Sequence, residues 1–209
     1  MNKKSVVSGV AGVFFGVLVG WIIGTQSGAV RPSPVPAAAA AGQATAAQPQ
    51  PPPPPPFDES RAAELKVTAE RSPNDATTRV LLGNLHFDAE RYDEASRWYE
   101  AALALDPKNV DASTDLGVAY YYSNQPDRAL AQFDKSLLIN KAHSKTLLNV
   151  GIVRAFGKQD LDGAAKAWQR VLDVAPDTPE AAVAKKALDG LRAAHPGQVG
   201  APKAPGQSD

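Results

Sequence analysis

The sequence predicts an all-α protein built from three consecutive helix–turn–helix repeats, and two observations support that prediction. Glycines recur at a fixed spacing of 34 residues, at Gly83, Gly117 and Gly151. A fixed period of this length is typical of solenoid proteins, in which each repeat is one supersecondary unit stacked on its neighbour. Each glycine is followed by a small residue and, four positions later, by an aromatic residue: Ala95 and Tyr99, Ala129 and Phe133, Ala164 and Trp168.

Each repeat ends on aliphatic residues and then on a position that usually stops the helix. This position holds Pro107 in the first repeat, Lys141 in the second and Pro176 in the third. A 34-residue period with Leu-Gly, then Ala, then an aromatic residue and then Pro resembles the tetratricopeptide repeat, or TPR. The resemblance implies a right-handed superhelix in which glycine lets paired helices approach closely. It also implies that the aromatic ring fills the space between neighbouring repeats.

The three copies depart from the TPR pattern at a few positions. Arg79 and His86 replace the tryptophan and the tyrosine that are usual in the first helix of a repeat. The third repeat is one residue longer than the others, and we expect the extra residue in the turn at 157–163. These departures are expected to change corners and loops and to leave the pairing of helices intact.

The N-terminus reads as a membrane anchor. Residues 1–4 carry two lysines, and residues 5–24 contain no charge, which is long enough for a helix that crosses a bilayer core of roughly 30 Å. The excess of positive charge before the span predicts a cytoplasmic N-terminus and an exported domain. We therefore expect a single-pass protein of the bacterial inner membrane with its TPR domain in the periplasm or outside. A cleaved signal peptide, cut near Ser27-Gly28-Ala29, is the alternative interpretation.

Within the predicted span, five small residues recur every fourth position and so lie on one helix face. Such a face allows close approach of two transmembrane helices, and it suggests a homodimer or pairing with a partner's helix. The alternative is that glycine is common in membrane helices generally. The residues of this face are Ser8, Gly12, Gly16, Gly20 and Gly24.

Residues 25–57 form a linker rich in alanine and proline. It ends in an unbroken run of prolines, Pro51–Pro56, and it has too few aliphatic residues for a core of its own. We expect disorder with a semi-rigid polyproline II stretch. A spacer that holds the domain away from the membrane is the simpler interpretation, and a docking peptide for a proline-binding module is the other.

The predicted TPR domain covers residues 58–195. Its repeats span about 76–109, 110–143 and 144–178, and cap helices at about 58–71 and 178–194 cover the open apolar faces at the two ends of the stack. Thr178 and Pro179 supply an N-cap and a first-turn proline for the last helix. Residues 196–209 are rich in glycine and proline, and we expect a disordered tail.

Composition and motifs give no indication of an enzyme. The chain has no cysteine, and His86, His143 and His195 are too far apart in sequence to suggest a metal site. We expect no catalytic residues, no cofactor and no metal. Equal numbers of acidic and basic residues, 22 of each, give no reason to expect nucleic-acid binding.

The TPR resemblance implies a protein or peptide partner bound in a concave groove that the first helix of each repeat lines. The tyrosines at 121 and 122 are expected in mid-groove, between Phe87 and Phe156. The alternative is that some of these aromatic residues pack between repeats and contact no ligand. Transferred position by position, the expected groove consists of Asn84, Phe87, Asp88, Thr114, Val118, Tyr121, Tyr122, Lys145, Leu148, Asn149, Ile152 and Phe156.

One TPR subclass holds the carboxylate of chaperone tails with a clamp of five Lys, Asn and Arg residues. This chain matches only Asn84 and Lys145 of that clamp, and Asp115 occupies one of the remaining positions. The departure argues against chaperone-tail binding.

The order of span, linker and TPR stack over residues 60–194 resembles the TPR subunits of bacterial cytochrome c maturation and haem-lyase systems. That resemblance implies an adaptor that presents apocytochrome to the ligation machinery. A structural scaffold for an envelope complex, without peptide recognition in the groove, is the alternative.

Overall fold

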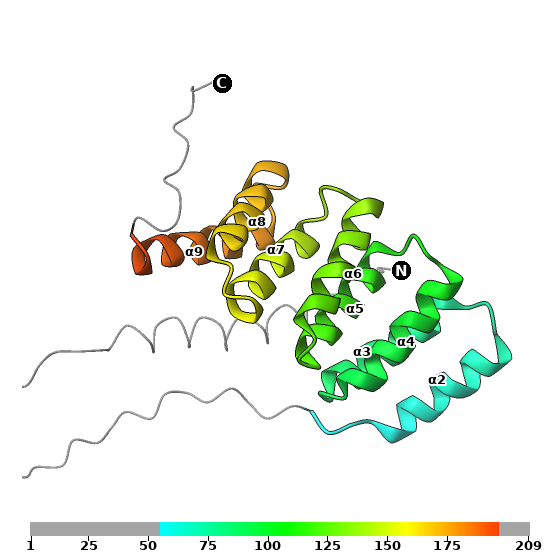
Figure 1. Cartoon of the computed structure of the whole chain (residues 1–209). Helices are drawn as coiled ribbons and strands as arrows, with labels where there is room; N and C mark the ends of the chain where they lie inside the picture. Colours follow the sequence, from blue (N-terminus) through cyan, green and yellow to red (C-terminus); the bar gives the residue numbers. More distant parts are fainter. Residues whose placement is uncertain (1–54, 197–209) are drawn as a thin grey trace, which may run out of the picture. The chain divides into compact units, whose positions relative to one another are not determined.

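The computed structural model describes residues 55–196, which lie within the second of two compact units of the chain. The described part contains eight α-helices and no strand (Figure 1). None of these helices is both long enough and apolar enough to span a membrane. The predicted span at 5–24, its face of small residues, the linker up to Pro54 and the tail from 197 onward lie outside the described residues.

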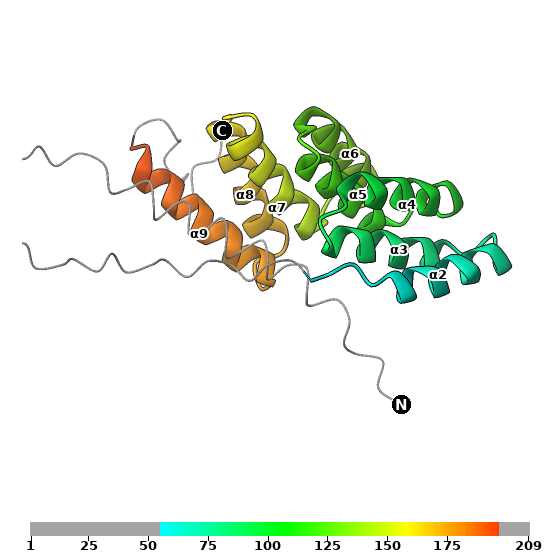
Figure 2. The ribbon, with the colours of Figure 1, turned by 90° about the horizontal axis from the view of Figure 1, so that it is seen from below.

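The helices pair in sequence order, each packed against the next (Figures 1 and 2). We call α3, α5 and α7 the A helices and α4, α6 and α8 the B helices. The A helices begin at residues 76, 110 and 144, where the three predicted repeats start. The elements are α2 (Glu59–Arg71), α3 (Ala76–Asp88), α4 (Tyr92–Leu105), α5 (Val110–Tyr122), α6 (Pro126–Ile139), α7 (Ser144–Ile152), the π-helical segment η1 (Val153–Gly157), α8 (Leu161–Val174) and α9 (Pro179–Ala194).

Side chains at the helix N-termini explain where several elements begin. Asp75 accepts from the backbone N–H of Thr77 at 2.9 Å, and Asn109 accepts from that of Ala112 at 2.9 Å. Each bond satisfies a backbone donor that has no partner within its own helix. Proline starts α6 and α9, where its missing N–H removes no helical hydrogen bond and its fixed φ suits the first turn.

A glycine in each A helix packs against an aromatic ring of the B helix in the same repeat. A Cβ at Gly117 would lie 2.4 Å from the Phe133 ring, and equally severe overlaps with Tyr99 and Trp168 occur at Gly83 and Gly151. The three rings are almost completely buried. The rings were expected to fill the space between neighbouring repeats, and the structure shows that each one lies against the glycine of its own repeat. Glycine is therefore needed to make room for the ring.

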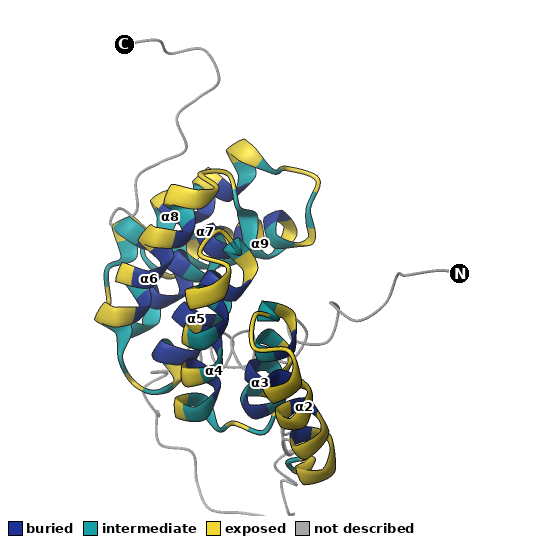
Figure 3. Ribbon diagram, turned by 90° about the vertical axis from the view of Figure 1, so that its right-hand side faces the viewer, coloured by how far each residue is buried: buried dark blue, intermediate teal, exposed yellow. Residues whose placement is uncertain are grey.

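The first and last helices cover the ends of the stack. Leu65 and Ala69 of α2 pack with Leu82 of α3, and Trp98 borders this cluster. At the other end, α9 packs on α7 and α8, with Leu188 buried in that contact. Burial therefore runs continuously through the stack, and the exposed positions lie on the outer faces of the helices (Figure 3).

The additional residue of the third repeat lies in the A helix, and its predicted place in the turn is wrong. After α7 the backbone continues as the π-helical segment η1, and the N–H of Lys158 donates to the carbonyl of Val153, five residues earlier, at 3.0 Å. A π turn accommodates one extra residue without breaking the helix. It also changes the direction of the residues within the segment, Phe156 and Gly157 among them.

Each turn between an A helix and its B helix contains one non-glycine residue with positive φ. These residues are Glu90 at 58°, Asn124 at 59° and Gln159 at 55°. Their equivalent places in the three repeats indicate that the left-handed conformation is part of the turn. Asn adopts it more readily than Glu or Gln.

Candidate binding face of the A helices

The predicted groove residues divide into an accessible set and a buried set. Thr114 is fully buried, and Val118 and Ile152 are 5% and 7% exposed. Their side chains therefore belong to the packing beneath the surface, which corrects the expectation that all twelve residues line the groove. The accessible or half-buried set comprises Asn84, Phe87, Asp88, Tyr121, Tyr122, Lys145, Leu148, Asn149 and Phe156.

The centre of this face is polar, and its groups bond to one another. The Lys145 ammonium lies 2.6 Å from Asp115 Oδ1, so an ion pair joins α5 to α7. Asn149 donates through Nδ2 to the carbonyl of Lys145 at 2.8 Å, and the Tyr99 hydroxyl donates to Asn84 Oδ1 at 2.8 Å. The two residues that match the chaperone clamp are therefore already engaged within the domain.

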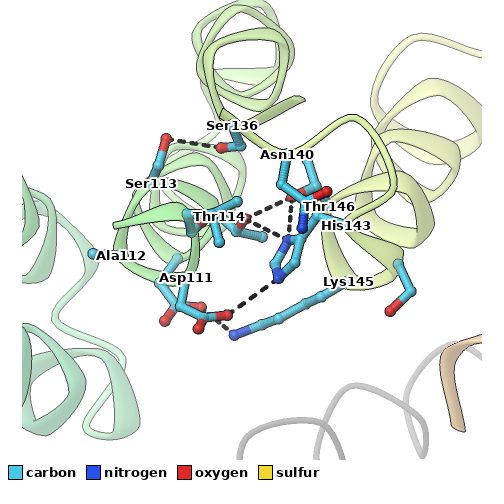
Figure 4. A network of polar contacts seen from close by, with 12 residues as sticks. Asp111, Ala112, Ser113, Thr114, Ser136, Asn140, His143, Lys145 and Thr146 are labelled. Atoms are coloured by element: carbon cyan, nitrogen blue, oxygen red, sulfur yellow. Dashed lines mark hydrogen bonds and ion pairs between the residues drawn. The ribbon is translucent and has the colours of Figure 1, made fainter. Parts of the chain in front are cut away.

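A second network beside this ion pair links the second repeat to the third (Figure 4). His143 Nε2 lies 3.3 Å from the Asp111 carboxylate, and its Nδ1 lies 2.7 Å from the Thr146 hydroxyl. That hydroxyl is 2.7 Å from the hydroxyl of Thr114. The hydrogen bond with His143 lowers the pKa of Asp111. Because both threonines are fully buried, an Asp–His–Thr arrangement at this place ties helices together.

The same face carries more acid than base. Burial raises the pKa of Asp115 in spite of its pairing with Lys145. Burial and the nearby charge of Asp115 also raise the pKa of Asp88. Asp88 and Asp115 thus ionise less readily than ordinary aspartates. Among the predicted groove residues, Lys145 is the one lysine that could neutralise a negative ligand. This arrangement is unsuited to an acidic peptide.

Aromatic rings gather where the A helices end and turn into the B helices. Tyr92 and Tyr122 stack with their ring centroids 4.8 Å apart, and Phe87 meets both rings edge-on at 5.2 and 5.8 Å. Tyr121 meets Tyr122 edge-on at 5.7 Å. Separations of 4.5–7 Å are those at which aromatic pairs attract. The cluster joins the first repeat to the second.

An open cavity of about 350 Å³ continues from this cluster towards the third repeat. A Cβ on Gly157 would lie 3.0 Å from Pro126 and 3.1 Å from Tyr121, so η1 approaches α5 and α6 closely here. The π turn is what brings Phe156 to the cavity wall. The lining residues are Tyr121, Tyr122, Asn124, Pro126, Phe156 and Gly157, none of them charged. We call the five aromatic residues Phe87, Tyr92, Tyr121, Tyr122 and Phe156 the aromatic edge.

Several of these residues were absent from the predicted groove. Tyr92 begins α4, while Asn124 and Pro126 belong to the turn and the first position of α6. The prediction considered A helices alone, and B-helix starts were therefore left out. The sequence did carry a signal, because Tyr92 and Pro126 are 34 residues apart and so share one repeat position. Among the described residues, no group of three His, Asp or Glu side chains could hold a metal ion.

Helix pairs stacked in this order, with a glycine beneath an aromatic ring in each pair, define a repeat protein of the TPR class. A TPR repeat family model matches residues 83–124. The MamA crystal structure superposes with a TM-score of 0.52 at 19% identity, over 62% of this chain and 80% of MamA, a likeness of fold. The first TPR domain of human RPAP3 gives 0.51 at 27% identity, over 57% of this chain and 93% of that domain. The family match and the fold together support TPR repeats in this chain.

Two curated proteins show which larger molecules contain similar sequences. Human RNA polymerase II-associated protein 3 is 30% identical over 99 residues, which are 47% of this chain and 15% of that protein. The cytochrome c-type biogenesis protein CcmH of Escherichia coli strain K12 is 26% identical over 135 residues, or 63% of this chain and 39% of CcmH. The chain thus spans well under half the length of either relative.

Proposed function

We propose that this protein is a membrane-anchored adaptor whose TPR domain holds an extended segment of a partner protein. In this proposal the domain lies on the exported side of a bacterial inner membrane. The uncharged run at residues 5–24 with two lysines before it, and the proline-rich linker after it, support the anchoring. The aromatic edge with its open cavity is the observation that supports segment binding, because it brings five aromatic rings from three repeats together around one open, uncharged cavity.

We further propose that the partner segment belongs to an apocytochrome c, and that the adaptor serves cytochrome c maturation. The likeness to CcmH over 135 residues supports this specialisation. The polar centre favours a segment without strong negative charge, because Asp88, Asp111 and Asp115 outnumber Lys145 there. Aromatic rings offer a large contact area at a low cost in side-chain entropy.

Binding can be tested with the full chain in lipid nanodiscs and labelled peptides that tile an apocytochrome c. We expect at least one peptide to bind saturably and Leu148→Glu to weaken it by more than tenfold, because that substitution adds a carboxylate to the A-helix face. Leu138→Glu is the matched control, since Leu138 is 80% exposed on the B helix α6. Capture of folded complexes alone, with no peptide bound, would support a scaffold instead. A periplasmic reporter enzyme fused to the C-terminus checks the topology, and an inactive fusion would contradict it.

A further inference from the structure

The aromatic edge is built from repeated positions, so it forms a continuous strip along one end of the stack. Phe87 and Tyr121 occupy the same repeat position 34 residues apart, and Tyr92 and Pro126 share another. The contact of Phe87 with Tyr122 joins the first two repeats, and the cavity wall of Tyr121 and Phe156 joins the second to the third. A ligand that follows the strip would therefore be extended and would cross all three repeats.

The chemistry of the strip selects among extended ligands. Among the described residues, no charged side chain lines the cavity, so none of them offers a charge there for an acidic or a basic peptide to pair with. The lining residues include Asn124 and Tyr121, whose side-chain amide and protonated hydroxyl can each donate a hydrogen bond. A polyproline II segment has flat apolar rings, free carbonyl acceptors and few N–H donors. Aromatic-lined grooves with hydrogen-bond donors are the surfaces that bind such segments.

The chain itself brings proline to this end of the stack. Phe57, the residue directly after Pro51–Pro56, contacts His86 in a tilted ring pair with centroids 4.6 Å apart, and the Arg91 guanidinium lies 4.2 Å above the Phe57 ring. His86 and Arg91 immediately precede Phe87 and Tyr92 of the aromatic edge. The described prolines Pro55 and Pro56 are exposed. The proline-rich segment therefore joins the domain at a residue that contacts the sequence neighbours of Phe87 and Tyr92.

The proline run is long enough to contact more than one ring of the strip. Six residues in polyproline II extend roughly 19 Å at about 3.1 Å each, which is about twice the roughly 8–10 Å between two packed helices. The run Pro51–Pro56 contains no glycine at which it could reverse onto the domain that it precedes. Two copies anchored in one membrane would present their runs to each other at a high effective concentration.

We propose that the aromatic edge is a docking site for a proline-rich segment in the polyproline II conformation, and that its occupant is the run Pro51–Pro56 of a second copy of the chain. Tyr121, Phe156 and Pro126 stack against the proline rings, and Asn124 and Tyr121 donate hydrogen bonds to proline carbonyls. This proposal rests on the proposed membrane anchoring, which supplies the local concentration. It names one class of ligand for the same edge that supports segment binding in the proposed function, so the proline run and a partner segment would compete there.

The first experiment measures binding of a fluorescein-labelled peptide of residues 46–56 by anisotropy. The protein is the full chain in nanodiscs with residues 51–54 changed to Gly-Ser-Gly-Ser, which removes competition from its own run. We expect saturable binding, a loss of at least tenfold for Tyr121→Ala, and a further loss when Phe156→Ala is added. Leu138→Ala should leave binding unchanged, and circular dichroism checks that each variant is folded. Equal binding of a peptide with alanine in place of the six prolines would overturn the proposal.

The second experiment identifies the source of the docked segment by disulfide crosslinking. Because the sequence contains no cysteine, only the two introduced cysteines can form a disulfide. One copy carries Pro54→Cys and the other Asn124→Cys, and the two are mixed in one membrane under oxidising conditions. A disulfide-linked heterodimer is expected, with little product when Pro54→Cys is paired with Leu138→Cys. A bond that forms only when both cysteines are in one chain would overturn the assignment to a second copy. If apocytochrome peptides bind while the proline peptide does not, this inference fails and the proposed function stands.

Discussion

Replacing Gly117 by alanine tests the packing rule on which the whole stack depends. The glycine lies in the central A helix and has no unusual φ, so alanine meets no backbone penalty there. The new Cβ would lie 2.4 Å and 2.7 Å from two carbons of the Phe133 ring, well inside van der Waals contact. The ring is fully buried and cannot move aside into solvent.

The size of the effect follows from two opposing contributions. Alanine stabilises a helix interior by about 1 kcal/mol relative to glycine. Overpacking a dense core costs typically about 1–3 kcal/mol and more where backbone must move, and here both the ring and the paired helix are fixed. Because the overlap forces backbone movement, we take a cost of about 3–4 kcal/mol, above the typical range. The net loss is then about 2–3 kcal/mol, which lowers the melting temperature by roughly 6–12 °C for a domain of this size.

Urea unfolding followed by circular dichroism measures this loss, and a double-mutant cycle tests its cause. Phe133→Leu removes the ring atoms that overlap, so it should cost less in the Gly117→Ala background than in the wild type, by about 1 kcal/mol or more. Gly190→Ala in α9, at a half-buried position, is the matched control and should be neutral or slightly stabilising. A stable Gly117→Ala variant, or strictly additive substitutions, would refute the packing argument.

Three further predictions concern the site and its surroundings. Tyr122→Ala should lower the free energy of unfolding in urea by about 2–3 kcal/mol, because it removes the stacked and edge-on ring contacts. Tyr121→Ala should abolish ligand binding and leave the free energy of unfolding nearly unchanged. Equal losses of stability in the two variants would contradict a packing role for Tyr122 and a binding role for Tyr121. Burial lowers the pKa of His86 in the folded state, so on acidification the unfolded chain binds a proton at a higher pH than the folded chain does. The melting temperature should therefore fall as the pH drops below about 6.5. His86→Tyr removes this titration and should make the fall at pH 5 smaller by roughly 2–4 °C. Lys145→Met should raise the pKa of Asp115 further and lower the free energy of unfolding by about 1–2 kcal/mol at pH 8. This loss should become smaller towards pH 4, where Asp115 is protonated. A loss of stability that does not change with pH would contradict the ion pair.

Much of the architecture follows from the period of the sequence. An aromatic ring can pack on a glycine sixteen residues earlier only if the second helix folds back on the first. The spacing of Gly117 and Phe133 therefore predicts the helical hairpin. The same period applied to α2 and α9 predicts end caps, because an exposed apolar face must be covered. The period could not predict where the additional residue of the third repeat lies, since a longer turn and a π turn have the same length in sequence.

The site was less predictable than the fold, for reasons visible in single residues. Thr114 occupies a repeat position expected at the surface, yet its hydroxyl lies in a buried network with His143 of its own repeat and Thr146 of the next. Tyr92 was overlooked because its contacts come from a B helix that only the turn geometry brings to the edge. Neither outcome depends on local sequence.

The sequence by itself therefore determined the class of fold, the number of repeats and the candidate surface, because these depend on spacing within the chain. Tertiary structure decided which candidate side chains remain accessible and which neighbours they meet. Phe156 illustrates the difference: its place in the third repeat could be counted from the sequence, but its position in the cavity wall depends on the π turn at Val153–Gly157 and on the approach of Gly157 to Pro126. Such contacts arise between residues far apart in the chain, where backbone direction and close packing decide the outcome together.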